Sequence, residues 1–260
     1  MLLDEPHPHE REQGDDGDRA GGEDGAAPGE GALEGLDVLH GPSRFVLGAA
    51  APPAAGRPRI VRLVFVSFEG ADGSGKSTQA ELLRAALADE GRDVVLTREP
   101  GGTELGEAVR ALVLDGPTMG AWAEAALFAA SRAEHVEEVI RPALDRGADV
   151  ICDRYVDSSL AYQGVARGLG IDAVLQLNLA VTGALLPDVT FLLLLDPEVA
   201  TGRHVDPDRL EREGAELQAK VDGAYRELAE RFGERIVAVD AAQAPDEIAR
   251  EVRERLRDRS

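Results

Sequence analysis

The segment that most constrains the fold is a glycine-rich string between a short apolar run and a helix-forming run. It fits the pattern G-x-x-x-x-G-K-[ST] with Gly70, Ala71, Asp72, Gly73, Ser74, Gly75, Lys76 and Ser77, and Thr78 follows. Glycines let successive backbone N–H groups turn inward around a phosphate, and the positive end of the following helix dipole adds to the attraction. The string therefore predicts a strand, a phosphate-binding loop and a helix, in this order.

Two side chains of this loop have an expected chemistry. Lys76 would place its charge near the β- and γ-phosphate oxygens of a nucleoside triphosphate, and the Ser77 hydroxyl would bind Mg²⁺. GTPases, motor ATPases, small-molecule kinases and non-catalytic nucleotide sensors share such a loop. The loop alone therefore predicts a protein that binds nucleoside triphosphates, and other segments must identify the acceptor.

From residue 59 onward, short β-type runs alternate with longer helical patterns. This alternation is typical of a parallel sheet that helices cover on both faces. The expected strands are Val61 to Phe68, Val94 to Thr97, Val150 to Cys152, Val189 to Leu195 and Ile236 to Val239. The expected helices are Ser77 to Glu90, Thr103 to Leu114, Trp122 to Asp145, Asp172 to Val181, Glu213 to Arg231 and Pro245 to Arg257. We therefore expect a doubly wound, five-stranded α/β domain of the P-loop NTPase type.

Residues 1–58 differ from the rest of the chain. They are rich in Gly, Ala, Pro, Asp and Glu and have almost no periodic apolar pattern. Such a segment cannot bury enough apolar surface to offset the entropy lost on ordering, so we expect a disordered acidic extension. A start codon assigned too early would explain the segment equally well. A single catalytic domain is expected over residues 59–260.

The net charge limits the classes of partner. The chain carries 28 Lys and Arg residues against 49 Asp and Glu residues, a formal net charge of −21. This charge repels nucleic acid and anionic membranes, whereas a local Arg cluster could still bind a small phosphorylated substrate. The N-terminus lacks the basic and apolar regions of a signal peptide, and the only cysteine, Cys152, fits a reducing compartment. We expect a cytoplasmic protein without nucleic-acid or membrane partners.

Three further segments indicate the acceptor. Residues 97–102 read TREPGG after the second strand, residues 127–132 read LFAASR on a long helix, and residues 153–164 run from DRY to YQG after the third strand. Loops at the carboxyl ends of parallel strands form the ligand crevice in such domains. With these strings in this order after the loop, residues 61–258 resemble the thymidylate kinase family. The resemblance implies transfer of the γ-phosphoryl group of ATP to dTMP, with Mg²⁺.

The resemblance also implies which charged residues act. Arg98 and Arg154 would hold the dTMP phosphate, for which a bidentate guanidinium is well suited. Asp72 would orient the acceptor sugar and phosphate, and with Lys76 and Arg154 it belongs to the expected catalytic residues. Glu99 would contact the substrate site and, with Asp153 and Ser77, lie near the Mg²⁺ ion.

A base and sugar pocket follows from the same resemblance. Phe128 would stack on thymine, and Arg132, four residues along the same helix face, would bond to the base edge. Tyr162 would lie under the deoxyribose and crowd out a 2′-hydroxyl, with Gln163 beside it in the substrate site.

One pocket position departs from the family pattern. The polar residue expected to contact the base is Ser159 or Ser158, where relatives commonly have Asn or Gln. Because a hydroxyl reaches less far than an amide, we expect this contact to pass through water.

A cation must also stabilise the charge on the transferring phosphoryl group. Within the family it comes from an arginine in the phosphate loop or from a mobile lid, and Gly73 leaves the loop without an arginine. The expected lid spans about residues 201–212, and its candidate catalytic arginines are Arg209 and Arg203. A solvated loop with compensating acidic residues is the alternative interpretation.

The resemblance implies a homodimer, since thymidylate kinases generally form one. The expected helix over residues 122–145 offers a small apolar face, although packing against the sheet explains that face equally well. Its residues are Trp122, Ala125, Ala126 and Ala129. Two other functions stay open at this point: another nucleoside monophosphate kinase, and a non-catalytic nucleotide-binding protein.

Overall fold

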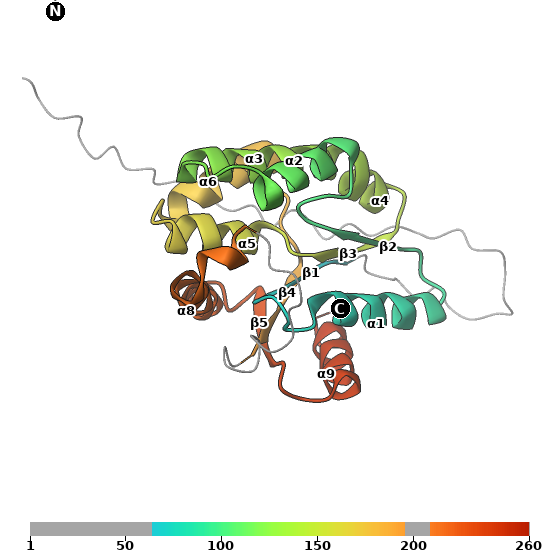
Figure 1. Cartoon of the computed structure of the whole chain (residues 1–260). Coiled ribbons are helices and arrows are strands. Elements are labelled where there is room, and N and C mark those ends of the chain that lie inside the picture. The colour runs from blue at the N-terminus through green and yellow to red at the C-terminus, as the bar shows by residue number, and fades with distance from the viewer. Residues whose placement is uncertain (1–63, 196–208, 260) are drawn as a thin grey trace, which may run out of the picture. The chain divides into compact units, whose positions relative to one another are not determined.

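The computed structural model describes residues 64–195 and 209–259, and the extension expected over residues 1–58 lies outside them (Figure 1). The described strands form one five-stranded, all-parallel sheet in the order β2-β3-β1-β4-β5. Their bounds are β1 Phe65–Gly70, β2 Val94–Arg98, β3 Asp149–Asp153, β4 Val189–Leu194 and β5 Ile236–Asp240. The expected five-stranded parallel sheet is therefore confirmed.

Helical segments lie between each pair of successive strands along the chain, as crossover connections between parallel strands require. The α-helices are α1 Lys76–Asp89, α2 Glu104–Asp115, α3 Ala121–His135, α4 Arg141–Asp145, α5 Val156–Ser159, α6 Ile171–Thr182, α8 Ala215–Arg231 and α9 Pro245–Arg257. Two π-helical stretches, η1 Val136–Ile140 and η2 Leu160–Ala166, and a short 3₁₀ turn, η3 Glu211–Glu213, complete the described elements. None of the described helices combines the length and apolarity needed to cross a bilayer.

The two faces of the sheet carry separate cores because successive strand side chains point in opposite directions. In β1, Phe65 belongs to the core under α3, α5, α6 and α8, whereas Val66 and Phe68 belong to the core under α1 and α9. Figure 1 shows these two helix layers on opposite sides of the strands. Burial on both faces also explains why the central strands are nearly continuous apolar runs. The doubly wound α/β prediction is thus confirmed.

The long helix expected over residues 122–145 is a continuous helical path with a change of winding. It runs through α3, η1 and α4, and the N–H of Arg141 donates to the carbonyl of Val136, five residues earlier. Pro142 follows directly and has no N–H to donate, so it could not have taken part in the regular ladder. The helix therefore passes the proline by widening one turn.

The helical segment over residues 156–166 differs from the sequence-based expectation, which places these residues in a loop after the third strand. Ser158, Ser159 and Gly164 are residues that favour turns, and they mask the helical pattern. Val156 and Leu160, four residues apart, are fully buried against the core. Burial that the local sequence does not reveal therefore decides the conformation here.

Candidate active site

The carboxyl ends of β1, β2 and β3 meet at one edge of the sheet. Phe68 lies opposite Asp153 in the register of β1 and β3, and Asp153 also pairs with Arg98 of β2. The glycine-rich loop leaves β1 at the same edge, where Gly70 lies opposite Leu193 of β4. The phosphate loop and the segments that begin at Arg98 and Asp153 are therefore neighbours in space.

The backbone of the loop requires its glycines. Gly70 has a φ of 138°, and a Cβ atom there would lie 2.4 Å from the carbonyl oxygen of Leu193. Gly75, with a φ of 93°, precedes α1 without a side-chain cap, and the space beside its Cα is open. The first N–H groups of α1 therefore have no side-chain cap from Gly75, and such a helix start suits an anion such as a phosphate.

Two other atoms of the loop fit a bound nucleotide. The Ser74 hydroxyl oxygen is buried and lacks a hydrogen-bond partner among the described residues. Lys76 is buried as well, and its Nζ donates to the Ala71 carbonyl at 2.8 Å and lies 3.4 Å from Asp72 Oδ1. Burial lowers the pKa of Lys76, and Arg154 lowers it further, while Asp72 and Asp153 oppose the shift. Thr78 lies exposed in the first turn of α1.

Two of the three predicted magnesium ligands come together. Ser77 Oγ of α1 donates to Asp153 Oδ2 at the end of β3, at 2.5 Å. Both oxygens are hard donors of the kind that Mg²⁺ binds, so this pair fits the ion. Glu99 differs from the prediction, because its carboxylate is buried and turned toward helix α3. Its two oxygens are bound by an arginine and a histidine, which is why it does not join the other two ligands.

The predicted phosphate arginine Arg154 lies beside the loop. Its Nη2 donates to Asp72 Oδ1 at 2.5 Å, and its Nη1 donates to the Ser158 hydroxyl and to the Tyr225 hydroxyl, each at 3.1 Å. Burial would lower the pKa of Arg154, but Asp72 and two tyrosines raise it well above its usual value. Its guanidinium lies 5.7 Å from the ring centroid of Tyr162. The predicted residues Asp72, Arg154 and Tyr162 are thus neighbours.

Arg98 lies at the expected edge but engages a different partner. Its Nη2 lies 3.0 and 3.1 Å from the two carboxylate oxygens of Glu107, in the first turn of α2, and its side chain is 56% exposed. The Gly102 N–H also donates to Glu107, and this bond lowers the pKa of Glu107 most, ahead of the effect of Arg98. Sequence reasoning missed this acidic partner of a predicted phosphate ligand.

The predicted base pocket is built around a fully buried arginine. Arg132 Nε donates to Glu99 Oε2 at 2.7 Å, and Nη1 donates to Ser159 Oγ at 3.0 Å and also to Asn178. Ser158 instead donates to Glu69 at 2.6 Å. Of the two candidate serines, Ser159 is therefore the one that adjoins Arg132. The predicted stacking residue, Phe128, is half-buried on the same helix and packs against the same core.

Glu69 is a site residue that sequence reasoning missed. This buried carboxyl group accepts hydrogen bonds from the Tyr155 N–H at 2.7 Å, the Ser158 hydroxyl at 2.6 Å and the Tyr225 hydroxyl at 3.1 Å. Burial, followed by repulsion from Asp157, raises its pKa to about 7. A glutamate within a mainly apolar strand was the signal that could have indicated it.

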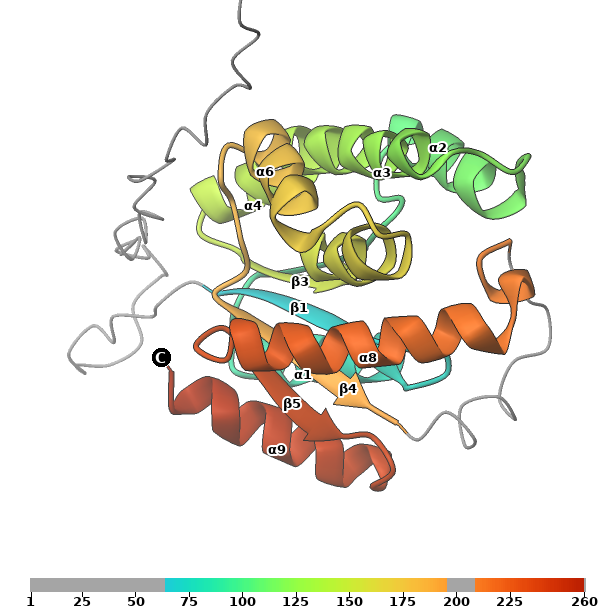
Figure 2. The same cartoon turned by 90° about the vertical axis from the view of Figure 1, so that its left-hand side faces the viewer.

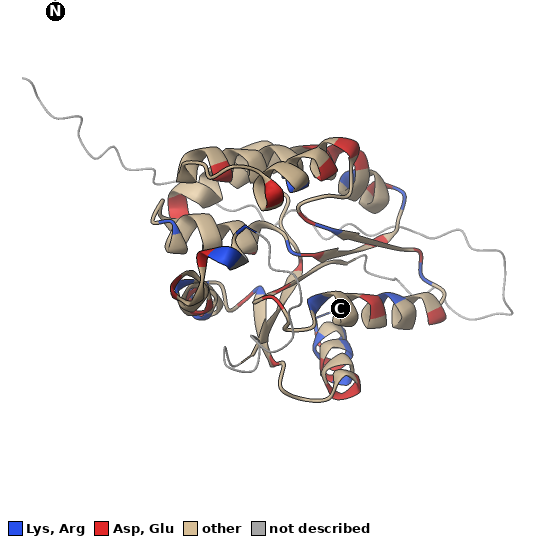
Figure 3. Ribbon diagram, viewed as in Figure 1, with Lys and Arg blue, Asp and Glu red and all other residues tan. Residues whose placement is uncertain are grey.

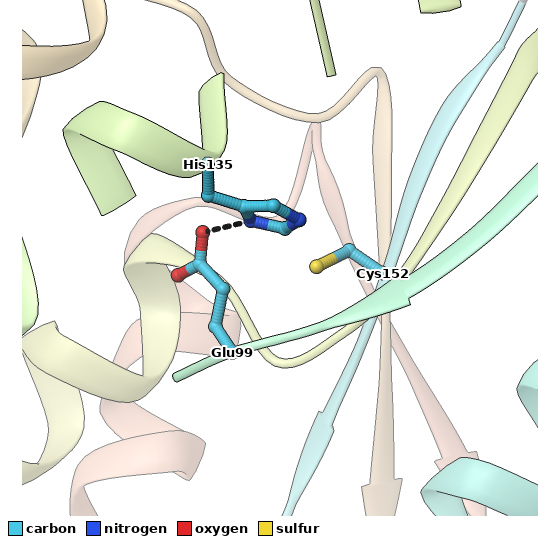
Figure 4. A group of neighbouring side chains, drawn as sticks. All are labelled: Glu99, His135 and Cys152. Atoms are coloured by element: carbon cyan, nitrogen blue, oxygen red, sulfur yellow. Dashed lines mark hydrogen bonds and ion pairs between the residues drawn. The ribbon is translucent and has the colours of Figure 1, made fainter. Parts of the chain in front are cut away.

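Figure 4 shows three side chains whose possible metal-ligating atoms lie within 4.8 Å of one another: Glu99, His135 and Cys152. His135 Nδ1 lies 2.9 Å from Glu99 Oε1, and its Nε2 lies 2.6 Å from Thr97 Oγ1. Burial, with help from Glu99, raises the pKa of the Cys152 thiol well above its usual value, and the thiol donates to the Arg154 carbonyl at 2.9 Å. Each ligating group thus has a hydrogen-bond partner, and His135 and Arg132 hold the two oxygens of Glu99.

The predicted lid arginines lie elsewhere or outside the described residues. Arg203 falls in the segment 196–208, which the structure does not describe. Arg209 is 8% exposed, and its Nε donates to the Val113 carbonyl at 2.7 Å while its Nη2 donates to Glu124 Oε2, also at 2.7 Å. Gln163 donates to the same carboxylate at 2.8 Å. The predictions that Arg209 is aimed at the phosphoryl group and that Gln163 contacts the substrate differ from this arrangement, because a buried glutamate holds both side chains.

Comparisons with known proteins agree with this arrangement of loops. Residues 68–252 match the family model described as Thymidylate kinase. The sequence is 48% identical over 194 residues to a thymidylate kinase of Symbiobacterium thermophilum, covering 73% of this chain and 91% of that protein. It is 50% identical over 197 residues to a thymidylate kinase of Clavibacter michiganensis, covering 74% of this chain and 93% of that protein.

A solved structure shares the fold as well. The crystal structure of thymidylate kinase from Ehrlichia chaffeensis superposes with a TM-score of 0.62 at 34% sequence identity, covering 74% of this chain and 98% of that one. The match spans nearly the whole of the solved chain, so it is not confined to the phosphate loop that many nucleotide-binding proteins share. The protein, with this sheet and these three segments around its phosphate loop, belongs to the thymidylate kinase family.

Proposed function

We propose that this protein is an active thymidylate kinase, which transfers the γ-phosphoryl group of ATP to dTMP and releases dTDP and ADP. The main support for this proposal is the position of one carboxylate oxygen, Asp72 Oδ1. Asp72 Oδ1 lies 3.4 Å from Lys76 Nζ and 2.5 Å from Arg154 Nη2. The cation expected at the donor phosphates and the cation expected at the acceptor phosphate therefore share a single anchoring atom, which would bring the two phosphates close together.

On the donor side, the loop N–H groups and the start of α1 would surround the phosphates of ATP. Lys76 would move from the Ala71 carbonyl to the phosphate oxygens, exchanging one acceptor for a charged one. Ser77 and Asp153 would hold Mg²⁺, which would neutralise charge on the β- and γ-phosphates.

On the acceptor side, Arg154 would bind the dTMP phosphate while Asp72 fixes the guanidinium from the other side. Arg154 has a φ of 69°, a conformation that non-glycine residues seldom adopt and that is found repeatedly at active sites. Arg98 would exchange Glu107 for the same phosphate, since an exposed ion pair of this kind is weak.

The base would lie between the half-buried ring of Phe128 and the polar edge formed by Arg132 and Ser159. Glu99 would act on this edge indirectly by holding Arg132 in place. The deoxyribose would rest on Tyr162, whose ring also lies near the Arg154 guanidinium. A hydroxyl group at C2′ would be crowded by this ring, which favours a deoxyribonucleotide.

A coupled assay of ADP release, with dTMP, dUMP, CMP, AMP and GMP as acceptors, tests this proposal. We expect turnover with dTMP to exceed that with the other nucleotides. Lys76→Ala is the control, and it should lose several orders of magnitude in kcat because it removes a charge next to the transferring group. Preference for another acceptor would indicate a different nucleoside monophosphate kinase. ATP binding without release of ADP would indicate a non-catalytic protein.

The proposal includes a cytoplasmic homodimer without nucleic-acid or membrane partners. The net charge of −21 argues against polyanions, and Figure 3 shows acidic and basic residues interspersed along the ribbon. The single cysteine, Cys152, is a buried free thiol, which suits a reducing compartment. Part of the expected dimer face was wrong, because Ala125 and Ala129 are buried within the domain, and only Trp122 and Ala126 are exposed.

Exposed apolar side chains on α2 and α3 support a revised dimer surface. Leu105, Leu112 and Trp122 are the exposed large hydrophobic residues of the described chain, and Trp122 is 53% exposed. We expect Trp122→Glu to shift the mass found by light scattering from dimer to monomer at micromolar concentration, because a charge would be buried in the interface. Ala88→Glu, at an exposed position of α1, is the matched control. A monomeric wild-type protein would remove the proposed dimer.

A further inference from the structure

A buried charge cluster lies at the start of helix α3, and neither the phosphate loop nor the base pocket includes it. We call it the Glu124 cluster; its members are Glu124, Gln163, Arg167, Arg209 and Glu213. Glu124 is fully buried, and its two oxygens accept four hydrogen bonds from three of these side chains. Burial alone would raise the pKa of Glu124, but the hydrogen bonds from Arg167, Arg209 and Gln163 outweigh it and lower the pKa.

The cluster ties together segments that are far apart in the sequence. Arg209 is the first described residue after the segment 196–208, and its N–H donates to the Leu114 carbonyl at 2.8 Å. Its side chain then bridges the Val113 carbonyl at the end of α2 and Glu124 of α3. In Figure 2 the turn that leads into α8 reaches toward these helices. The chain returning from β4 is therefore fastened to α2 and α3 at Arg209.

A second set of bonds fastens the other wall of the proposed pocket. Gln163 of η2 donates to Glu124 Oε1 at 2.8 Å. Arg167, just after η2, donates to both Glu124 oxygens, at 3.1 and 3.0 Å, and to Glu213 Oε1 at 2.6 Å. Helix η2 also carries Tyr162, the residue expected under the deoxyribose. The bonds to Glu124 therefore hold η2 and this residue at a fixed distance from α3.

The position of Glu124 on α3 links the cluster to nucleotide recognition. Phe128 and Arg132 follow it at intervals of four residues, so the three side chains lie along one face of the helix. A shift of the start of α3 would therefore displace the expected stacking ring before it displaces the phosphate loop. The hydrogen bonds given above for the cluster run to α2, α3, η2 and η3.

We propose that Glu124 is a positioning residue that sets the width of the dTMP pocket, and that Arg209 acts through Glu124 as an anchor of the segment leading into α8. This inference rests on the proposed thymidylate kinase function. It assigns Arg209 a role away from the reacting phosphoryl group. It also explains why two arginines and one glutamine converge on one buried carboxylate, while Glu213 bonds to the same two arginines.

Calorimetric titration with dTMP and, separately, with ATP tests the proposal on Glu124→Gln, Arg209→Met and the double variant of the full chain. We expect each single variant to weaken dTMP binding and to raise KM for dTMP about tenfold, with ATP binding and kcat within about threefold of wild type. We expect the double variant to bind dTMP no more weakly than the single variant with the larger loss, because both substitutions break the same bond between Arg209 and Glu124. A residue that only stabilised the fold would lower Tm without separating dTMP from ATP in this way.

Two further variants serve as controls, one for the removal of a charge and one for a failure of Glu124→Gln to fold. Glu216→Gln removes a charge from an exposed pair with Lys220 on α8, so its binding and Tm should match wild type. Gln163→Leu keeps both ion pairs and breaks only the bond between η2 and Glu124, which provides a milder variant if Glu124→Gln does not fold. It should weaken dTMP binding in the same direction.

Specific results would overturn the inference. A loss of kcat of about 10³ in Arg209→Met, with Glu124→Gln near wild type, would mean that Arg209 reaches the transferring phosphoryl group. Equal losses of dTMP and ATP binding in the folded variants would mean that the cluster has a structural role only. Failure of the proposed function is distinguishable, because the wild-type protein itself would then neither bind dTMP nor release ADP.

Discussion

Glu69 illustrates at the residue scale how burial changes the chemistry of a single group. Its carboxyl group lies near the end of β1 and accepts hydrogen bonds from the hydroxyl groups of Ser158 and Tyr225. Both hydroxyl groups also accept hydrogen bonds from Arg154. The charge of Arg154 and the hydrogen bonds from Ser158 and the Tyr155 N–H favour the charged form, but burial and Asp157 outweigh them. Protonation of Glu69 therefore changes the negative charge next to the proposed phosphate-binding arginine.

The raised pKa of Glu69 predicts a pH-dependent stability. The pKa of Glu69 is about 7 in the folded protein, whereas the ordinary pKa of a glutamate is 4.5, so the unfolded chain binds fewer protons between these pH values. The free energy of unfolding should therefore fall as pH rises through this window, by an amount on the order of 3 kcal/mol, and level off above it. Urea titrations of wild type and Glu69→Gln measure the difference. Parallel curves for the two proteins would contradict the prediction.

The sequence alone could indicate a site residue and its partner only where the two lie close together in the sequence. The phosphate loop has its pattern within nine residues, and the family strings mark Arg98, Arg154 and Arg132 directly. The partner of Arg209 was not predictable, because Glu124 is separated from it by 85 residues. The same holds for Tyr225, which meets Glu69 across 156 residues. Local patterns indicate that a charge is present, whereas only the fold reveals what neutralises it.

At the scale of the elements, helix α2 supplies the present partner of Arg98, the residue predicted to bind the dTMP phosphate. Glu107 in its first turn holds both the Gly102 N–H and the exposed guanidinium of Arg98. Its position near the positive end of the helix dipole also favours the carboxylate. Arg98 must therefore leave an existing partner before it can bind a nucleotide phosphate.

Glu107→Gln should consequently lower KM for dTMP by up to about fivefold, since an exposed ion pair contributes about 1 kcal/mol or less. Steady-state kinetics with dTMP as the varied substrate measures this change. Glu104→Gln, in the same first turn of α2, is the matched control and should leave KM unaltered. If KM instead rose in Glu107→Gln, Glu107 would be aiming Arg98 rather than competing for it.

The elements themselves were predictable to different degrees. The strands are short runs rich in apolar residues, so all five were found, with ends that differ by a few residues. The helical segment over residues 156–166 was missed, because its stability comes from the burial of Val156 and Leu160 and not from residues that favour helices. Tertiary packing overrode local preference there, next to the proposed acceptor site.

At the scale of the whole molecule, the described residues form one compact unit within residues 43–260. Deletion of residues 1–58 should leave kcat within about twofold of wild type and Tm nearly unchanged, because this acidic, glycine-rich sequence has no apolar pattern with which to dock. Kinetics and calorimetry on the full and shortened chains measure both quantities. A large fall in Tm would show that the extension packs on the domain.

The shared oxygen of Asp72 has a consequence for how two substrates occupy the enzyme. If ATP draws Lys76 toward its phosphates, the contact between Lys76 and Asp72 is lost while Asp72 keeps its bond to Arg154, so we expect the acceptor site to change before dTMP arrives. Thermodynamic linkage then requires that ATP alter the affinity for dTMP by the same factor by which dTMP alters the affinity for ATP. Titrating each nucleotide with a non-transferable analogue of the other present measures that factor. A factor of one would mean that the two sites fill independently despite sharing an atom.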